Sequence, residues 1–198
     1  MRCDEPKLIH AFRLASGEHV TVRPACPRDA GLIAAYIAAL SPPGRYNRFL
    51  GAVKELAPAE LAHITHLDHR DQTALIVEID AGDTPNMIGE ARLAIAPDGQ
   101  SCELAISVAD VWRRKGVGGR LLHDLECRAR GRNVQRILAD VLRTNEPMKA
   151  LARRTGFEMA GPQRDGRLVR IVKEISPPAV AGSPRDGTGE AEPSAAAA

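Results

Sequence analysis

The residues best suited to chemistry form a basic, glycine-rich stretch, "VWRRKGVGGRLL" (Val111–Leu122). Its glycines and cations are Gly116, Gly118, Gly119, Arg113, Arg114, Lys115 and Arg120. Glycine allows successive backbone N–H groups to turn toward one ligand, and it allows that ligand to approach closely. A helix that begins here adds a partial positive charge and unpaired N–H donors. The stretch therefore predicts an anion site, and a pyrophosphate is the natural ligand.

Two well-known phosphate-binding loops do not fit this stretch. A P-loop requires GxxxxGK[ST], and no Lys-Ser or Lys-Thr pair follows these glycines. A Rossmann fingerprint requires GxGxxG, and Leu121 stands where the third glycine is needed. On these residues alone, an ordinary solvated basic turn remains open as an alternative.

The elements before this loop predict an antiparallel meander. Hydrophobic alternation indicates a hairpin over Phe12–Arg23 that turns at Ser16 and Gly17. Helical spacing and capping residues predict three helices. The first covers Arg28–Leu40, the second is short and begins after Ser41 as its N-cap, and the third covers Ala57–Leu67. Three strands are expected over Thr73–Asp80, Ile88–Ala96 and Cys102–Val108, with a tight turn at Asp98-Gly99 between the last two.

The elements after the loop predict a crossover. Leu121, Leu122, Leu125 and Ala129 repeat at helical spacing, and Gly131 fits the C′ position that ends a helix. A strand over Arg136–Leu142, a helix from Asn145 to Gly156 and a strand over Arg167–Ile175 should follow. We therefore expect an α+β fold, with an antiparallel meander followed by one parallel β-α-β pair at the loop.

Composition narrows the class of protein. The chain has 198 residues and a net charge of +2, and only 3% of its residues are aromatic, so we expect no nucleic-acid partner. No run is long and apolar enough to span a membrane, and the first ten residues lack the apolar h-region of a signal peptide, so we expect no membrane association. The cysteines Cys3, Cys26, Cys102 and Cys127 are scattered, so we expect free thiols and a cytoplasmic location.

Domain organisation follows from the end of the chain. From Ser176 onward the sequence consists mostly of Pro, Gly, Ala and Ser, which offer little to bury. We expect one folded domain over residues 1–175 and a disordered tail over residues 176–198.

The stretch "ISVADVWRRKGVGGRLL" resembles the acetyl-CoA loop of the GNAT acetyltransferase superfamily, [RQ]xxGx[GA]. Arg113, Gly116 and Gly118 stand at the three defined positions. Downstream, "NEPMKALARRTGF" is similar to the asparagine-containing helix of that family, and the order of elements agrees over roughly Val20–Ile175. The resemblance implies the GNAT fold, with acetyl-CoA as co-substrate.

A narrower resemblance concerns the segment after the first helix. Leu40, Ser41, Pro42, Tyr46, Arg48 and Phe49 match an "LSP…YxRF" segment found in the acetyltransferase domains of Pat-type protein lysine acetyltransferases. This resemblance implies an enzyme that acetylates a primary amine, with a protein lysine as acceptor, although standalone relatives of unknown substrate share the segment. A small-molecule amine and an acetyl-CoA-sensing module without turnover remain alternatives. We expect a monomer or a homodimer.

The resemblance also implies site residues. "CELAISV" carries Glu103 where the Pat-type pattern "AEfAvvV" has its general base, and partial burial would raise the pKa of that carboxyl group toward neutrality. Glu90 on the neighbouring strand is the reserve candidate. The backbone of Ile106 and Val108 should pair with the pantetheine arm, and Asn145 should contact the cofactor near its sulfur. The full predicted cofactor set is Ile106, Ser107, Val108, Arg113, Arg114, Lys115, Gly116, Val117, Gly118, Gly119, Arg120 and Asn145.

Three further features of the sequence bear on function. Many GNAT enzymes use a late tyrosine as general acid, whereas Tyr36 and Tyr46 are both early, so water or unassisted thiolate departure must suffice. His63, His66 and His69 lie near acidic residues, but their spacing spreads them around a helix, so we expect no metal site. The basic run Cys127–Arg136 fits a helix end better than a nucleic-acid patch.

Overall fold

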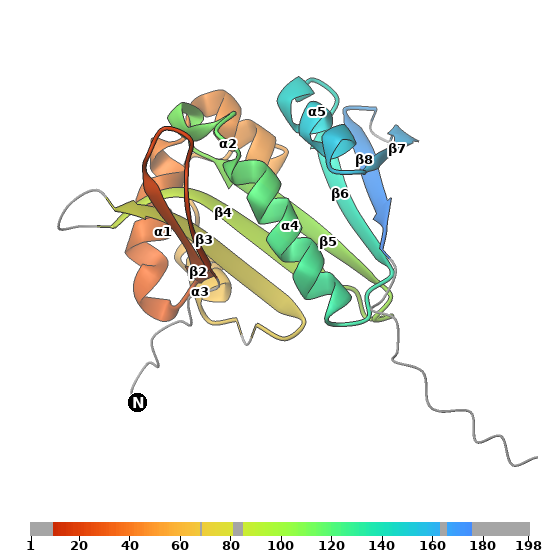
Figure 1. Cartoon of the computed structure of the whole chain (residues 1–198), viewed down its shortest axis with the longest axis horizontal. Coiled ribbons are helices and arrows are strands. Elements are labelled where there is room, and N and C mark those ends of the chain that lie inside the picture. Colours follow the sequence, from red (N-terminus) through yellow and green to blue (C-terminus); the bar gives the residue numbers. More distant parts are fainter. Residues whose placement is uncertain (1–9, 68, 81–84, 163–165, 176–198) are drawn as a thin grey trace, which may run out of the picture.

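The computed structural model describes residues 10–67, 69–80, 85–162 and 166–175, and these residues form one mixed sheet (Figure 1). The sheet has eight strands in the order β1-β2-β3-β4-β5-β6-β8-β7. The strands are β1 (His10–Arg13), β2 (His19–Pro24), β3 (Gln72–Asp80), β4 (Pro85–Ile95), β5 (Ser101–Val108), β6 (Arg136–Leu142), β7 (Glu158–Pro162) and β8 (Leu168–Glu174). The helices are α1 (Ala30–Ala39), α2 (Pro42–Phe49), α3 (Pro58–Thr65), α4 (Val117–Arg130) and α5 (Glu146–Arg154). Single 3₁₀ turns, η1 (Pro27–Asp29) and η2 (Asp110–Trp112), precede α1 and α4.

The predicted topology is confirmed. Strands β1 to β5 are antiparallel neighbours, β5 and β6 run parallel, and β8 is antiparallel to β6. The hairpin, the Asp98-Gly99 turn and the five helices lie where the sequence predicts them. The expected tail over residues 176–198 lies outside the described residues, so the domain boundary stays a prediction.

Two details differ from the sequence prediction. Strand β7 was not predicted, and it forms by pairing with β8 at the edge of the sheet. Gly131 ends α4 in a right-handed conformation, with φ −65°, instead of the left-handed C′ conformation that favours glycine. The chain uses Asn133, with φ 59°, for the left-handed residue after this helix.

Apolar side chains cover both faces of the sheet. Helix α4 lies across one face, where Leu121, Leu125 and Ala129 are fully buried against strand residues. Helices α1, α2 and α3 lie on the opposite face, and Ile33 and Ile37 of α1 are buried there (Figure 1). The sheet is therefore a rigid middle layer, and side chains of β5 alternate between the α4 face and the α1–α3 face.

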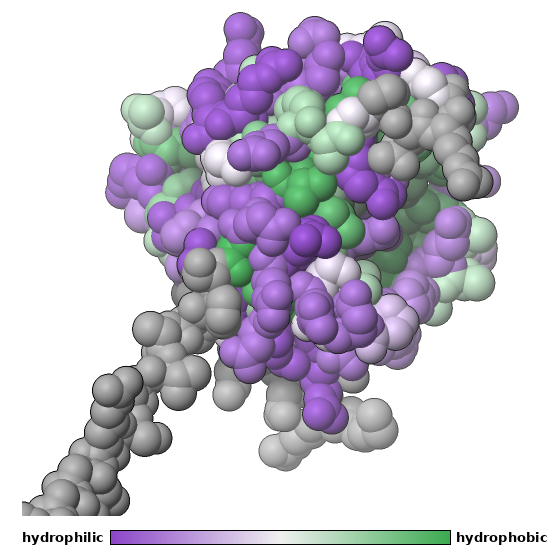
Figure 2. Space-filling model, turned by 90° about the vertical axis from the view of Figure 1, so that its right-hand side faces the viewer, coloured by the Kyte–Doolittle hydropathy of each residue, from purple (hydrophilic) through white to green (hydrophobic). Residues whose placement is uncertain are grey.

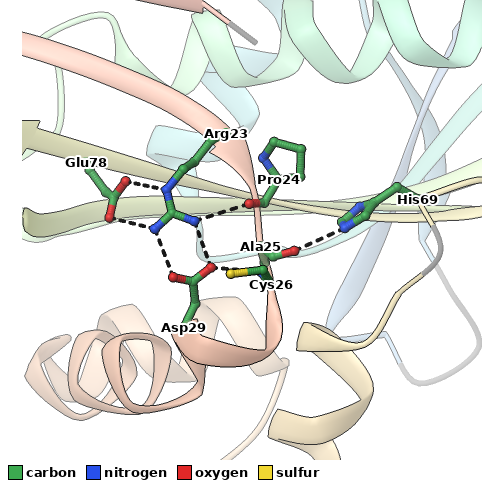
Figure 3. Close-up of polar contacts among 7 residues, drawn as sticks. All are labelled: Arg23, Pro24, Ala25, Cys26, Asp29, His69 and Glu78. Carbon is green, nitrogen blue, oxygen red and sulfur yellow. Dashed lines mark hydrogen bonds and ion pairs between the residues drawn. The ribbon is translucent and has the colours of Figure 1, made fainter. Parts of the chain in front are cut away.

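A largely buried ion cluster joins β2 to the start of α1 (Figure 3). The guanidinium of Arg23 donates to both oxygens of Asp29, at 2.8 Å each, and to both oxygens of Glu78, at 2.7 and 3.0 Å. Asp29 also accepts from the Cys26 backbone N–H at 2.7 Å. Burial alone would raise the pKa of Asp29, but the hydrogen bonds from Arg23 and Cys26 outweigh it and the pKa is lowered.

Candidate active site

The strands β5 and β6 separate partway along their length. Within the described residues their parallel pairing covers only Ser101–Glu103 and Arg136–Leu138, although both strands continue beyond it. Figure 1 shows the two ribbons diverging toward α5. The second half of β5 therefore has a free edge in the middle of the sheet.

The backbone groups on this free edge can be assigned from the hydrogen bonds on the other side. The Ala109 N–H donates to the Ile88 carbonyl on the β4 side, and backbone groups of alternate residues point to opposite sides of a strand. Leu104, Ile106 and Val108 therefore direct their N–H and C=O groups toward the gap. Consistent with this direction, Arg113 Nε donates to the Val108 carbonyl at 3.2 Å. An extended ligand in the gap could pair with Ile106 and Val108 as an added strand.

A cavity of about 550 Å³ lies along this edge. Nine residues of the predicted cofactor set line it, and these are Ile106, Ser107, Val108, Arg113, Arg114, Gly116, Gly118, Gly119 and Asn145. The structure thus gathers most of the predicted set around a single space. Two helices that the sequence did not predict at this site complete the lining. They contribute Gly44, Asn47 and Arg48 of α2 and Pro147, Met148, Leu151 and Arg154 of α5, with Thr155 after it. The spacing of Pro147, Leu151 and Arg154 on one face of α5 was the signal that could have found the second group.

The glycine loop has the geometry of an anion site. Gly116 precedes α4 with φ 94°, a conformation that side chains disfavour. The first backbone hydrogen bond of α4 joins the Arg120 N–H to the Gly116 carbonyl at 3.1 Å, so the N–H groups of residues 117 to 119 precede the helical ladder. Among the described residues no side chain caps this end. These donors and the helix dipole favour a phosphate group.

Three residues of the predicted cofactor set do not line this cavity. Lys115 and Arg120 line a separate space of about 480 Å³ beside β1, on which Gly116 and Gly119 also border. Arg120 Nε donates to the His10 ring at 3.0 Å and Arg120 forms an ion pair with Asp124 at 3.7 Å. Val117 is 1% exposed and its side chain belongs to the core. Their roles in cofactor binding stay predictions, and for Val117 only the backbone is available.

A second cavity, of about 330 Å³, adjoins the first and contains Glu103. The two cavities share Asn47, Arg48, Ile106, Asn145 and Met148, so they meet beside the middle of β5. Figure 2, which looks toward the β7–β8 side, shows a hollow with hydrophobic groups at its floor and hydrophilic groups around it. The arrangement provides one elongated space with the glycine loop at one end and a carboxylate at the other.

The environment of Glu103 differs from the sequence expectation. Its side chain is exposed, so the partial burial that we expected is wrong, and solvent reaches the carboxylate. Asp140 of β6 lines the same cavity and is held by two hydrogen bonds from Arg170, at 2.9 and 2.8 Å. The cavity thus presents two carboxylates, of which Asp140 is neutralised by its arginine.

Glu90, the reserve candidate, lies in a different environment. It is 2% exposed, lines neither cavity, and accepts from Arg48 Nε at 2.6 Å and from Arg92 Nε at 3.0 Å. Burial would raise the pKa of Glu90, but the two guanidinium charges outweigh it and the pKa is lowered. A carboxylate with a lowered pKa is a weak base, so the geometry favours Glu103.

The remaining predicted features are also located. Asn145 caps α5, because its Oδ1 accepts a hydrogen bond from the Met148 N–H at 3.2 Å. Asn145 also lines both cavities. Tyr36 lines neither cavity, and its hydroxyl is 2.9 Å from Ser107 Oγ. In the described part of the chain, no cluster of three or more His, Cys, Asp or Glu side chains is placed to hold a metal ion. None of the described helices is long and apolar enough to cross a membrane.

Comparisons with known proteins point to one family. The model of the acetyltransferase (GNAT) family matches residues 38–157. Acetyltransferase PA5475 of Pseudomonas aeruginosa is 28% identical over 144 residues, which cover 73% of this chain and 77% of that protein. The GNAT domain of S. lividans PAT superposes with a TM-score of 0.76 at 24% identity, over 84% of this chain and 96% of that one. Spermidine N-acetyltransferase from Vibrio cholerae, solved with CoA and spermine, superposes with a TM-score of 0.62 at 20% identity. The match covers 78% of this chain and 95% of that one.

Proposed function

Because the chain belongs to the acetyltransferase (GNAT) family, whose members use acetyl-CoA, we propose that it transfers the acetyl group of acetyl-CoA directly to a primary amine. One observation carries this proposal. The cavity at the glycine loop and the cavity at Glu103 meet beside the free edge of β5, so a thioester bound at one end can face an amine that enters from the other.

The nine lining residues of the predicted set, with the N–H groups that precede α4, would hold the cofactor. The loop donors suit the pyrophosphate, and the edge of Ile106 and Val108 suits the amide groups of the pantetheine arm. Asn145 lies at the junction, where the sulfur end would be. Gly118 brings the helices together, since a Cβ atom there would lie 3.1 Å from the Leu151 side chain.

The chemistry requires a neutral amine. A lysine amine with a pKa of about 10.4 is almost entirely protonated at neutral pH. Glu103 removes a proton from this amine, the nitrogen attacks the carbonyl carbon of the thioester, and the carbon–sulfur bond then breaks. The electron pair leaves on the thiolate, and the second proton that the nitrogen loses reaches the thiolate through water. The exposure of Glu103 allows the proton to pass on to solvent.

A protein lysine is the acceptor that we propose first. The residues that resemble the Pat-type segment, Leu40 to Phe49, include α2, and Arg48 and Phe49 of that helix line the cavity of Glu103. The Pat-type resemblance therefore concerns the acceptor side of the site. A small amine is the second candidate, supported by the fold shared with a spermidine N-acetyltransferase and by the carboxylates of the cavity.

A turnover assay tests the function. The full chain is incubated with acetyl-CoA and a panel of proteins, lysine peptides and small amines, and free thiol is measured. We expect thiol release that depends on the acceptor, and acetyl-lysine in the protein or peptide arm. Binding of acetyl-CoA without thiol release for any acceptor would contradict the enzyme and favour a sensor.

Cofactor binding at the loop can be tested separately. In a Gly116→Glu, Gly118→Glu double variant, two carboxylates stand where the anion should bind and a side chain is forced onto the left-handed Gly116. Calorimetry should then detect no acetyl-CoA binding. Gly131→Glu is the matched control, because it changes the far end of the same helix and lines neither cavity. Unchanged affinity in a folded double variant would remove the loop from the cofactor site.

A further inference from the structure

Arg48 occupies an unusual position between the two cavities. Its side chain is 7% exposed, and the residue lines both cavities at the place where they meet. Its Nε donates to Glu90 Oε1 at 2.6 Å. Its Nη2 is buried and has no hydrogen-bond partner among the described residues. A buried N–H donor without a partner costs free energy, so a ligand oxygen that reached it would be bound favourably.

The charge around Arg48 is also unbalanced. Glu90 is shared with Arg92, so two guanidinium groups have one carboxylate between them. Ser107 Oγ also donates to Glu90 Oε1, at 3.3 Å, so Arg48 shares this acceptor oxygen with a second donor. The three charged groups together carry a net positive charge in surroundings where water screens charge weakly, and Glu60 of α3 offsets part of it at Arg92.

The fold determines which of the two arginines lies beside the cavities. Ser107 lies between Ile106 and Val108, the two residues whose backbone groups face the gap, and its side chain contacts the Arg48–Glu90 pair. Arg92, the other partner of Glu90, lines neither cavity. Of the two arginines, only Arg48 is therefore placed beside the reacting groups.

We propose that Arg48 donates a hydrogen bond to the carbonyl oxygen of the acetyl thioester and stabilises the negative charge that develops there during transfer. This inference rests on the proposed function. When the amine nitrogen bonds to the carbonyl carbon, the π electron pair moves to that oxygen. The guanidinium donates to the oxygen without losing its proton, and the electron pair re-forms the carbon–oxygen double bond when the thiolate leaves.

The same positive charge acts on the amine. A fixed cation near the junction disfavours an ammonium group there and lowers the pKa of the amine that approaches the thioester. Glu103 lies in the same cavity and takes the proton. Arg48 and Glu103 thus act on the same step from two positions, since one disfavours the protonated amine and the other removes its proton.

Three variants separate this role from a structural one. Arg48→Met removes the donor and the charge, Arg48→Lys keeps the charge but loses the forked geometry, and Arg92→Met breaks the other half of the same ion cluster away from the cavities. Acceptor-dependent thiol release should fall by about 10²–10³ in kcat for Arg48→Met. It should fall less for Arg48→Lys and change little for Arg92→Met, with acetyl-CoA affinity retained in all three.

The pH profile supplies a readout that a structural role would not move. The rate rises with pH as the amine loses its proton. If the guanidinium lowers the amine pKa, Arg48→Met should move this rising limb to higher pH, whereas Arg92→Met, which keeps the guanidinium at the junction, should move it less. Circular dichroism and calorimetric acetyl-CoA binding verify that each variant is folded.

Two outcomes would overturn the inference. The first is a kcat for Arg48→Met or Arg48→Lys no lower than that of Arg92→Met. The second is a rising limb that stays in place in Arg48→Met, the variant that removes the charge. If the unmodified chain itself binds acetyl-CoA but releases no thiol with any acceptor, the proposed function fails first, and the inference fails with it.

Discussion

Two largely buried arginine–carboxylate clusters in this protein have opposite compositions. At the start of α1, one arginine, Arg23, meets two carboxylates, and its three guanidinium nitrogens all donate hydrogen bonds (Figure 3). Beside β5, two arginines meet one carboxylate, Glu90, and both Arg48 and Arg92 have a buried Nη2 without a partner in the described part of the chain.

In our proposal, the difference separates a cluster that stabilises the fold from one that acts on the substrate. Arg23, Asp29 and Glu78 line neither of the two joined cavities, and their hydrogen bonds join β2, β3 and the start of α1. The Glu90 cluster leaves donors unfilled and extends through Arg48 into both cavities. A saturated cluster adds to the stability of the fold, whereas an unsaturated one beside a cavity is suited to bind a group that arrives with the substrate.

The largest effect that we expect on stability comes from Arg23→Met. It leaves Asp29 and Glu78, which are 4% and 6% exposed, without their cation. Removing one partner of a buried ion pair costs about 3–5 kcal/mol. Urea denaturation should show this loss in the free energy of unfolding, while the folded fraction keeps its acetyl-transfer rate.

Arg92→Met tests the stability contribution of the Glu90 cluster. Glu90 keeps Arg48 as a partner, so the loss should be smaller, about 1–3 kcal/mol for one charged hydrogen bond. The same urea titration measures both variants. A loss for Arg92→Met equal to that for Arg23→Met would show that the two clusters do not differ in the way described.

A smaller effect should appear in acid. The pKa values of Asp29 and Glu90 are lowered in the folded protein, so their contributions to stability are present above the unfolded pKa values and are lost as the pH falls through the folded ones. The free energy of unfolding should therefore decrease below about pH 5. In Arg23→Met, protonation relieves an unpaired buried charge, so its difference from the unmodified chain should narrow. A difference that stays constant into acid would contradict the assigned role of Arg23.

The sequence predicts the fold well where its signals are local. Turn residues, capping residues and hydrophobic periodicity locate the hairpin, the three central strands and the helices. Strand β7 has no such signal, because "EMAGP" is short and contains glycine and proline, and it becomes a strand only by pairing with β8. Gly131 ends α4 as predicted, but its backbone is right-handed. The left-handed residue comes two positions later, at Asn133.

The site could be predicted only in part, for a similar reason. The glycine loop and the strand before it are contiguous, so their residues were found together. The side on which Lys115 and Arg120 lie depends on how the loop turns, and the sequence does not record that turn. The pairing of Arg48 with Glu90 joins residues 42 positions apart and depends on packing of α2 against the sheet. The exposure of Glu103 likewise depends on how far the helices cover its face of the sheet.

The most direct test of the account is the steady-state rate of Glu103→Gln beside that of the unmodified chain, with an active amine acceptor. The account predicts a kcat about 10²–10⁴ lower at neutral pH, unchanged calorimetric affinity for acetyl-CoA, and partial recovery at alkaline pH, where more amine is neutral without a base. A Glu103→Gln variant that is as fast as the unmodified chain at neutral pH would contradict it.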